Sequence, residues 1–125
     1  MYHVGTAVEF VALHVMPGME GPEGTLHSHD YRLEVVLDRE ALDGHGMVCD
    51  LDILDEILAS IATTLGGKNL EMIRPADTEA VTVEVLARWS HEQFATGLAK
   101  SGVDDIHVRV YENPIAFGGY SSPPH

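Results

Sequence analysis

Apolar and polar side chains largely alternate along His27-Ser-His-Asp-Tyr-Arg-Leu-Glu-Val-Val-Leu-Asp38, the pattern of a β-strand with one buried face. Side chains two residues apart project from the same face of a strand, so His27 and His29 lie side by side. Apolar side chains continue that face, namely Tyr31, Leu33, Val35 and Leu37. The stretch therefore predicts a strand that presents two neighbouring imidazoles at one end of its apolar face.

A third histidine ends an earlier alternating stretch, Val8-Glu-Phe-Val-Ala-Leu-His14. Two ligands from one strand and a third from a neighbouring strand predict a metal site made of His14, His27 and His29. Zinc bound by three protein ligands keeps a coordination position open for water or substrate, which is typical of a catalytic metal. The alternative is that these histidines bind no metal, because isolated His-x-His pairs are common in proteins.

Length and charge narrow the class of protein. A chain of 125 residues is long enough for one domain with a two-layer core. A net charge of −13 argues against binding to nucleic acid or to an anionic membrane surface. The single cysteine, Cys49, excludes an intrachain disulfide and fits a reducing compartment. With no visible signal peptide or membrane span, we expect a cytoplasmic protein.

The order of expected elements predicts an α+β fold. Asp50 is a good helix N-cap, and apolar residues then recur at helical spacing until Gly66-Gly67. A second helix is expected from about Thr82 and closes before Gly102. The expected strands cover residues 4–14, 27–38, 106–112 and 115–120. The order ββααββ favours a four-stranded antiparallel sheet with both helices on one face. Residues 1–120 would form this domain and 121–125 a tail, and the open sheet edges predict a homo-oligomer.

Five ordered segments resemble the 6-pyruvoyltetrahydropterin synthase and 6-carboxytetrahydropterin synthase family, whose members have the tunnelling fold. Leu26-His-Ser-His-Asp-Tyr31 resembles the family's L-H-G-H-N-Y. Phe10-Val-Ala-Leu-His14 is similar to its first zinc-histidine segment, and Gly46-Met-Val-Cys-Asp50 to its G-M-V-x-D. Thr82-Val-Glu84 resembles its T-x-E, and Tyr111-Glu112 the pterin-anchoring glutamate near the end. The resemblance spans nearly the whole chain.

The resemblance implies a Zn²⁺ ion held by His14, His27 and His29. It also implies a hexamer with a pterin at a subunit interface, its side-chain hydroxyls facing the zinc and its ring bound by Glu112. A carboxylate such as Glu112 accepts two hydrogen bonds from an amino-pyrimidinone edge, a charge-assisted pairing. Without the resemblance, Glu112 is an ordinary glutamate at the end of a strand.

The chain departs from the family at the residues that transfer protons. The family's synthases use a cysteine in the loop before the two histidines, and the corresponding residue here is Glu23. Cys49 lies in another segment and is expected in the core. Gly66 and Gly67 stand where the family has an aspartate–histidine pair. A subgroup with glutamate for cysteine cleaves the side chain of dihydroneopterin triphosphate to leave 6-hydroxymethyldihydropterin, which makes Glu23 the candidate acid/base.

These observations predict a zinc-dependent lyase that acts on the side chain of a dihydropterin such as dihydroneopterin triphosphate. The first alternative is a pterin-binding protein that keeps zinc and ring recognition but lacks synthase activity. The second is a metal-binding domain for another ligand, such as a purine-like heterocycle.

Overall fold

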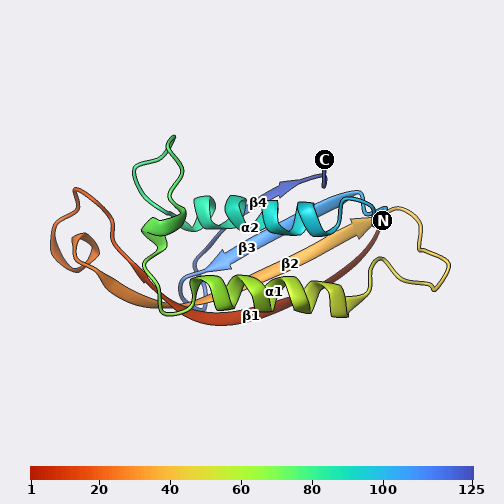
Figure 1. Ribbon diagram of the computed structural model, residues 1–125, viewed down its shortest axis with the longest axis horizontal. Helices are drawn as coiled ribbons and strands as arrows, with labels where there is room; N and C mark the ends of the chain where they lie inside the picture. Colours follow the sequence, from red (N-terminus) through yellow and green to blue (C-terminus); the bar gives the residue numbers. More distant parts are fainter.

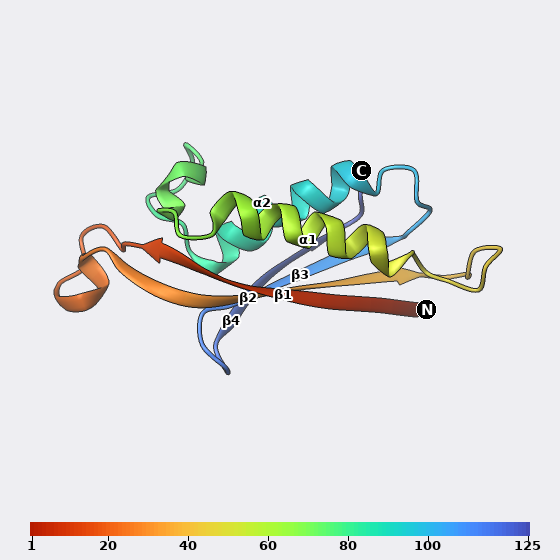
Figure 2. The same ribbon diagram turned by 60° about the horizontal axis from the view of Figure 1, so that its bottom comes forward.

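The computed structural model describes all 125 residues as a sheet covered on one face by two helices (Figures 1 and 2). The elements follow the predicted order ββααββ. The sheet order is β1-β2-β3-β4, with every neighbouring pair antiparallel. The strands are β1 Tyr2–His14, β2 His27–Arg39, β3 Asp105–Tyr111 and β4 Phe117–Ser122. The helices are α1 Leu51–Leu65 and α2 Val83–Gly97, so the predicted fold class is confirmed.

The core lies between the sheet and the helices. The face of β2 that begins with the two histidines continues with the buried Tyr31, Leu33, Val35 and Leu37. Opposite them, α1 buries Leu54, Leu58, Ile61 and Leu65, which share one helical face. The apolar side chains of β2 and α1 therefore pack against each other in one layer. This layer determines the strand register, because a one-residue slip would move the apolar side chains of the strand to the uncovered face.

Both helices begin at the predicted caps. The Asp50 carboxylate accepts a hydrogen bond from the backbone N–H of Asp52, and the Thr82 hydroxyl accepts one from Val85. Figure 1 shows α1 lying over β1 and β2 and α2 lying over β3 and β4. Neither helix has the length and apolar character that crossing a membrane requires.

The last strand differs from its predicted bounds of 115–120. The Asn113 side chain accepts hydrogen bonds from the backbone N–H groups of Ile115 and Ala116, at 3.0 and 2.8 Å, and this holds them in a turn. The strand therefore starts at Phe117 and includes Ser121 and Ser122, which the sequence placed in the tail. β1 likewise begins at Tyr2, two residues before its expected start.

Candidate metal centre and adjoining pocket

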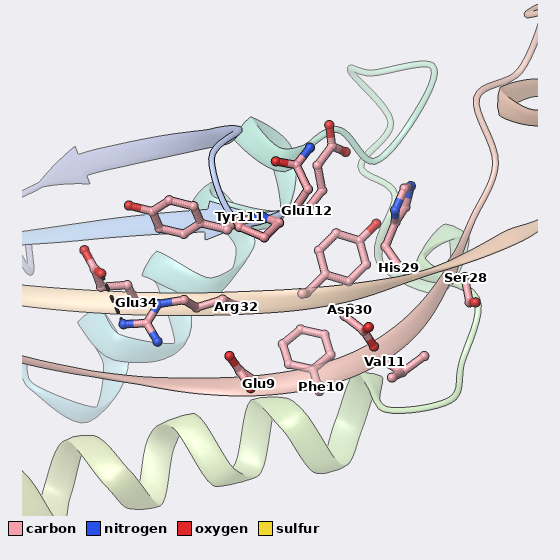
Figure 3. Close-up of a pocket in the computed structure, with 13 residues that line it drawn as sticks. Glu9, Phe10, Val11, Ser28, His29, Asp30, Arg32, Glu34, Tyr111 and Glu112 are labelled. Carbon is pink, nitrogen blue, oxygen red and sulfur yellow. Dashed lines mark ion pairs between the residues drawn. The ribbon is translucent and has the colours of Figure 1, made fainter.

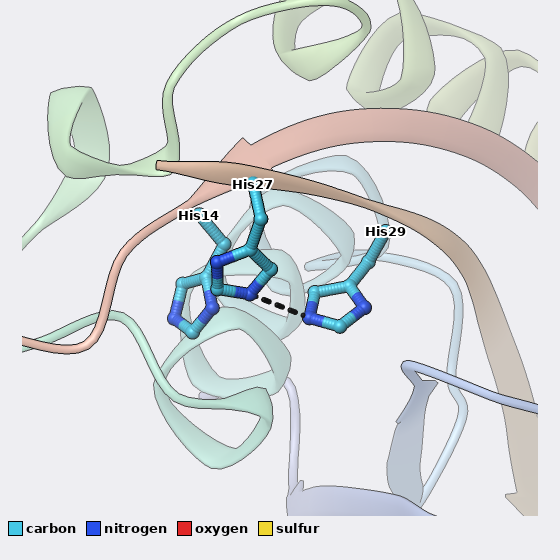
Figure 4. Close-up of side chains that lie close together, drawn as sticks. All are labelled: His14, His27 and His29. Atoms are coloured by element: carbon cyan, nitrogen blue, oxygen red, sulfur yellow. Dashed lines mark hydrogen bonds between the residues drawn. The ribbon is translucent and has the colours of Figure 1, made fainter. Parts of the chain in front are cut away.

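The pairing of β1 with β2 brings the three histidines together. His14 lies directly opposite His27, and Ala12 lies opposite His29. Because all three histidines project from the helix-covered face, their rings gather on the same side of the two strands (Figure 4). The Nε2 atoms of His27 and His29 are 2.9 Å apart, and one nitrogen from each of the three rings lies within 4.8 Å of the others.

The backbone sets the tautomer of His27. Its Nδ1 lies 2.7 Å from the carbonyl oxygen of Thr25, and a carbonyl only accepts, so Nδ1 carries the proton that it donates. A neutral His27 therefore turns the lone pair of Nε2 toward His14 and His29. Zinc-ligating histidines are typically held in this way, with the outer ring nitrogen bonded to a carbonyl or carboxylate.

His14 provides the test of whether these residues fit a metal. It is only 5% exposed, and neither of its ring nitrogens makes a hydrogen bond of good geometry, although the backbone of Val81 lies close enough to oppose part of the pKa shift. Burial lowers the pKa of His14, and the neighbouring His27 and His29 lower it further, so the ring is held neutral. Buried polar atoms are rarely left unpaired, and a neutral imidazole is the form that binds metal. The three nitrogens fit a zinc ion, whose tetrahedral ligands lie roughly 3.4 Å apart.

A cavity of about 280 Å³ adjoins the three-histidine cluster and contains both predicted carboxylates. His14, Glu23, Tyr31 and Glu112 all line it. The start of α2 contributes further lining residues, including Thr82 and Glu84 of the Thr-Val-Glu segment. The structure thus brings together three stretches of the chain that lie far apart in the sequence.

Glu23 reaches toward the histidines from the loop between β1 and β2. It lies in a short 3₁₀ turn, Gly21–Gly24, and its carbonyl oxygen accepts a hydrogen bond from the backbone N–H of Met16. Its carboxylate lies 3.7 Å from Nε2 of His27, while its side chain remains 56% exposed. The carboxylate therefore stands beside the lone pairs that would hold a metal, on the open side of the cavity.

Glu112 approaches the same cavity from the other direction, directly after β3. Its negative charge acts across the cavity to raise the pKa of His14 and of Tyr31. Burial raises the pKa of the Tyr31 phenol far above its usual range, and Glu112 and Glu23 raise it further. Tyr31 is therefore a neutral hydroxyl between two carboxylates. Sequence analysis placed Tyr31 on the strand face of His27 and His29 but assigned it no role in the site.

A larger groove of about 1020 Å³ continues from this region across the sheet (Figure 3). His29, Tyr31 and Glu112 line it, together with Tyr111 and polar side chains of the uncovered face such as Arg32. The groove and the cavity share Tyr31 and Glu112, so a ligand that reaches the histidines has an open approach.

The segment after α1, where the family has its aspartate–histidine pair, is bonded to β1 through its backbone. Gly67 donates a backbone hydrogen bond to Val11 at 2.7 Å, and Lys68 accepts one from Leu13 at 2.9 Å. The segment after α1 thus lies against the end of β1, next to His14. Cys49 is buried and precedes α1, so the length of that helix, about 22 Å, separates it from the segment. Burial also raises the pKa of its thiol, and Asp50 raises it further.

Solved structures with the same fold include several 6-pyruvoyl tetrahydropterin synthases. The Caenorhabditis elegans protein has a TM-score of 0.74 and 21% identity, and the match covers 97% of this chain and 95% of that one. The Plasmodium falciparum protein has a TM-score of 0.75 and 15% identity, covering 97% and 98%. A Plasmodium vivax variant, in which a catalytic glutamate is replaced by cysteine, has a TM-score of 0.72 and 16% identity, covering 98% and 99%.

A search of curated protein sequences finds no match. The model of the family described as 6-pyruvoyl tetrahydropterin synthase, by contrast, matches residues 3–122. That range contains both helices, every residue of the site and all four strands except Tyr2, the first residue of β1. The chain belongs to the 6-pyruvoyl tetrahydropterin synthase family, and its sheet and helices form the tunnelling fold.

Proposed function

We propose that this chain is a zinc-dependent enzyme that processes the side chain of a dihydropterin. Membership of the family supports a pterin-processing, synthase-like function. The observation that carries the proposal is the cavity in which His14, Glu23 and Glu112 meet. One wall supplies imidazole ligands, one an acid/base candidate and one an acceptor for a pterin ring.

In this proposal Glu112 recognises the pterin ring and Glu23 transfers protons. The Glu112 carboxylate would accept the two N–H groups of the amino-pyrimidinone edge and so orient the pterin side chain toward the histidines. Glu23 would take a proton from the substrate and return it to the product, because its oxygen already lies beside the imidazole ends. Zinc in such a site supplies Lewis-acid stabilisation of negative charge that develops on a substrate oxygen.

Loss of the family's aspartate–histidine pair favours a lyase over the synthase reaction. The resemblance to the glutamate-bearing subgroup points to dihydroneopterin triphosphate, whose side chain would be cleaved to leave 6-hydroxymethyldihydropterin. The Plasmodium vivax relative supports a catalytic glutamate in this fold. The same glycine pair also favours a second candidate, a protein that binds zinc and pterin without turnover.

One experiment separates the two candidates. Zinc-loaded protein is incubated with dihydroneopterin triphosphate and, separately, with sepiapterin, and the products are identified by mass. Side-chain cleavage that Glu23→Gln abolishes supports the lyase, whereas tight pterin binding without product supports the binding protein. Glu20→Gln is the matched control, because Glu20 is an exposed glutamate of the same loop whose side chain makes no cap bond.

We further propose that the protein works as a homo-oligomer, a hexamer if it follows the family resemblance. β1 and β4 each have one unpaired edge in the single chain. Apolar side chains are exposed near both edges, including Val11 at 47% and Ile115 at 86%. Light scattering tests this by comparing the solution mass with six times the chain mass of 13.6 kDa.

A further inference from the structure

Tyr31 lines both the cavity beside the three histidines and the larger groove, yet the proposed function gives it no role. The residue is only 2% exposed. Its hydroxyl makes no hydrogen bond within the chain, but it is not among the polar atoms that are both unpaired and closed off from solvent. The small surface that Tyr31 keeps therefore includes its hydroxyl. A buried tyrosine hydroxyl normally has a partner, and here a partner must bind in the cavity.

Packing on two sides holds the ring of Tyr31 in place. Phe10 is its direct partner in the pairing of β1 with β2, and the two ring centroids are 5.8 Å apart. The ring of His29, on the same face of β2, lies edge-on with its centroid at 5.7 Å. Because the ring is packed in this way, the hydroxyl has a nearly fixed position. A ligand that bonds to it loses little entropy in ordering this side chain.

Strand register places Tyr31 beside Glu112. The antiparallel pairing of β2 with β3 ends at Arg32 and Tyr111. One step further along both strands, Tyr31 and Glu112 lie level with each other, and both line the cavity. Glu23 lines the same cavity from the loop between β1 and β2. Tyr31 thus lies between the proposed anchor of the pterin ring and the proposed acid/base.

The hydroxyl of Tyr31 supplies what the two carboxylates lack. Ionised Glu23 and Glu112 only accept hydrogen bonds. A phenol, whose ordinary pKa is about 10, keeps its proton at neutral pH and donates it in a hydrogen bond. A ligand with N–H groups at one end can therefore bond to Glu112, while an acceptor atom further along the same ligand meets Tyr31.

On the basis of the proposed function, we propose that the Tyr31 hydroxyl donates a hydrogen bond to the dihydropterin where its ring joins its side chain. A 7,8-dihydropterin has an imine nitrogen, N5, at this junction, and its lone pair accepts a hydrogen bond. With the ring edge on Glu112 and the side chain facing the histidines, N5 is the acceptor nearest the middle of the cavity.

This hydrogen bond strengthens during side-chain cleavage. Glu23 would take the proton of the second side-chain hydroxyl, and the bond between the first two side-chain carbons would break to leave an aldehyde. The electron pair of that bond moves onto the C6–N5 imine, so negative charge develops at N5. The first carbon then takes up the proton from Glu23, which completes the hydroxymethyl product. Tyr31 keeps its own proton throughout and stabilises the transition state more than the bound substrate.

Tyr31→Phe tests the role of the hydroxyl. The substitution keeps the ring in contact with Phe10 and His29 and removes one oxygen atom. With dihydroneopterin triphosphate as substrate, kcat should fall about 100-fold, the usual effect of losing one preorganised donor. KM and zinc content should change less than about threefold. Tyr2→Phe is the control, because Tyr2 is 53% exposed at the start of β1, and it should behave as the wild type does. An unchanged kcat in Tyr31→Phe would overturn the proposal.

A measurement on the unmodified chain covers the case in which the variant misfolds. The protein contains four tyrosines, and ¹³Cζ labelling gives each a separate NMR signal. The Tyr31 signal, identified by elimination of the other three, should shift when sepiapterin saturates the protein, while the Tyr2 signal stays in place. Bound sepiapterin with an unmoved Tyr31 signal would overturn this role alone. A wild type that binds no pterin would overturn the proposed function as well.

Discussion

The three-histidine cluster and the segment after α1 lie side by side, yet they relate to the family pattern in opposite ways. His14, His27 and His29 keep the family's ligand pattern, and a metal would satisfy one of the unpaired ring nitrogens of the buried His14. The adjacent segment, Gly66 to Asn69, has glycines where the family has an aspartate and a histidine, and its backbone bonds to β1. The proposed metal binding and the proposed proton transfer therefore rest on different parts of one site.

The two glycines change the chemistry of this segment and leave the fold around it unchanged. The backbone hydrogen bonds from Gly67 to Val11 and from Leu13 to Lys68 hold the segment against the strand that carries His14. A changed pair of side chains thus leaves the position of the metal ligands intact. In the proposed function, proton transfer would then depend on Glu23, which approaches from the loop between β1 and β2.

The strongest test of the comparison removes a ligand. His27→Ala should abolish tight zinc binding at the cluster, weakening it by more than about 100-fold, because Nε2 of His27 is the atom that the Thr25 carbonyl orients. Competition with a zinc chelator measures the change. His45→Ala, a substitution in an exposed turn, serves as the control. Unchanged zinc affinity in His27→Ala would show that these histidines are not the metal site.

Glu23→Gln should lower turnover roughly 100- to 10,000-fold, the usual contribution of a positioned acid or base. Zinc content and pterin affinity should stay as in the wild type, because the side chain is isosteric and 56% exposed. Steady-state rates with dihydroneopterin triphosphate measure turnover, and zinc analysis of the same samples shows whether the metal is retained. Full activity of Glu23→Gln would show that Glu23 is not the base, and the base would then have to be sought in the segment after α1.

Glu112→Gln should weaken pterin binding about 10- to 100-fold, because hydrogen bonds to a charged acceptor contribute about 1.5–3 kcal/mol. Quenching of pterin fluorescence measures the affinity. Zinc binding should persist, since Glu112 is not among the residues grouped around the metal site. Loss of zinc together with pterin would mean that Glu112 supports the cluster itself and not the ring.

Sequence patterns predicted the strands, the helices and the grouping of the three histidines for the same reason, the periodicity of buried side chains. A strand with one buried face must alternate, so His27 and His29 necessarily share the face that buries Leu33. β4 offered no such signal, because glycines and exposed side chains fill it and its start depends on the Asn113 turn. Tyr31 lines the same cavity as Glu23, from the loop between β1 and β2, and Glu112, from the end of β3. Side-chain periodicity within one strand does not predict contacts with such distant segments.

The smallest expected effect concerns the segment after α1. Gly67 has φ +71°, a left-handed conformation that disfavours any side chain, so Gly67→Ala should lower the free energy of unfolding by about 1–2 kcal/mol. Gly44→Ala is the control, because Gly44 has an ordinary φ and open space around it, and it should be neutral or stabilising by up to about 1 kcal/mol. Urea denaturation of both variants measures the difference. If Gly67→Ala were as stable as Gly44→Ala, the backbone would tolerate side chains there, and the glycine pair would reflect chemistry alone. A destabilised Gly67→Ala would instead show that the segment has adapted its backbone to the loss of the pair, so that restoring aspartate and histidine would strain the contact with β1.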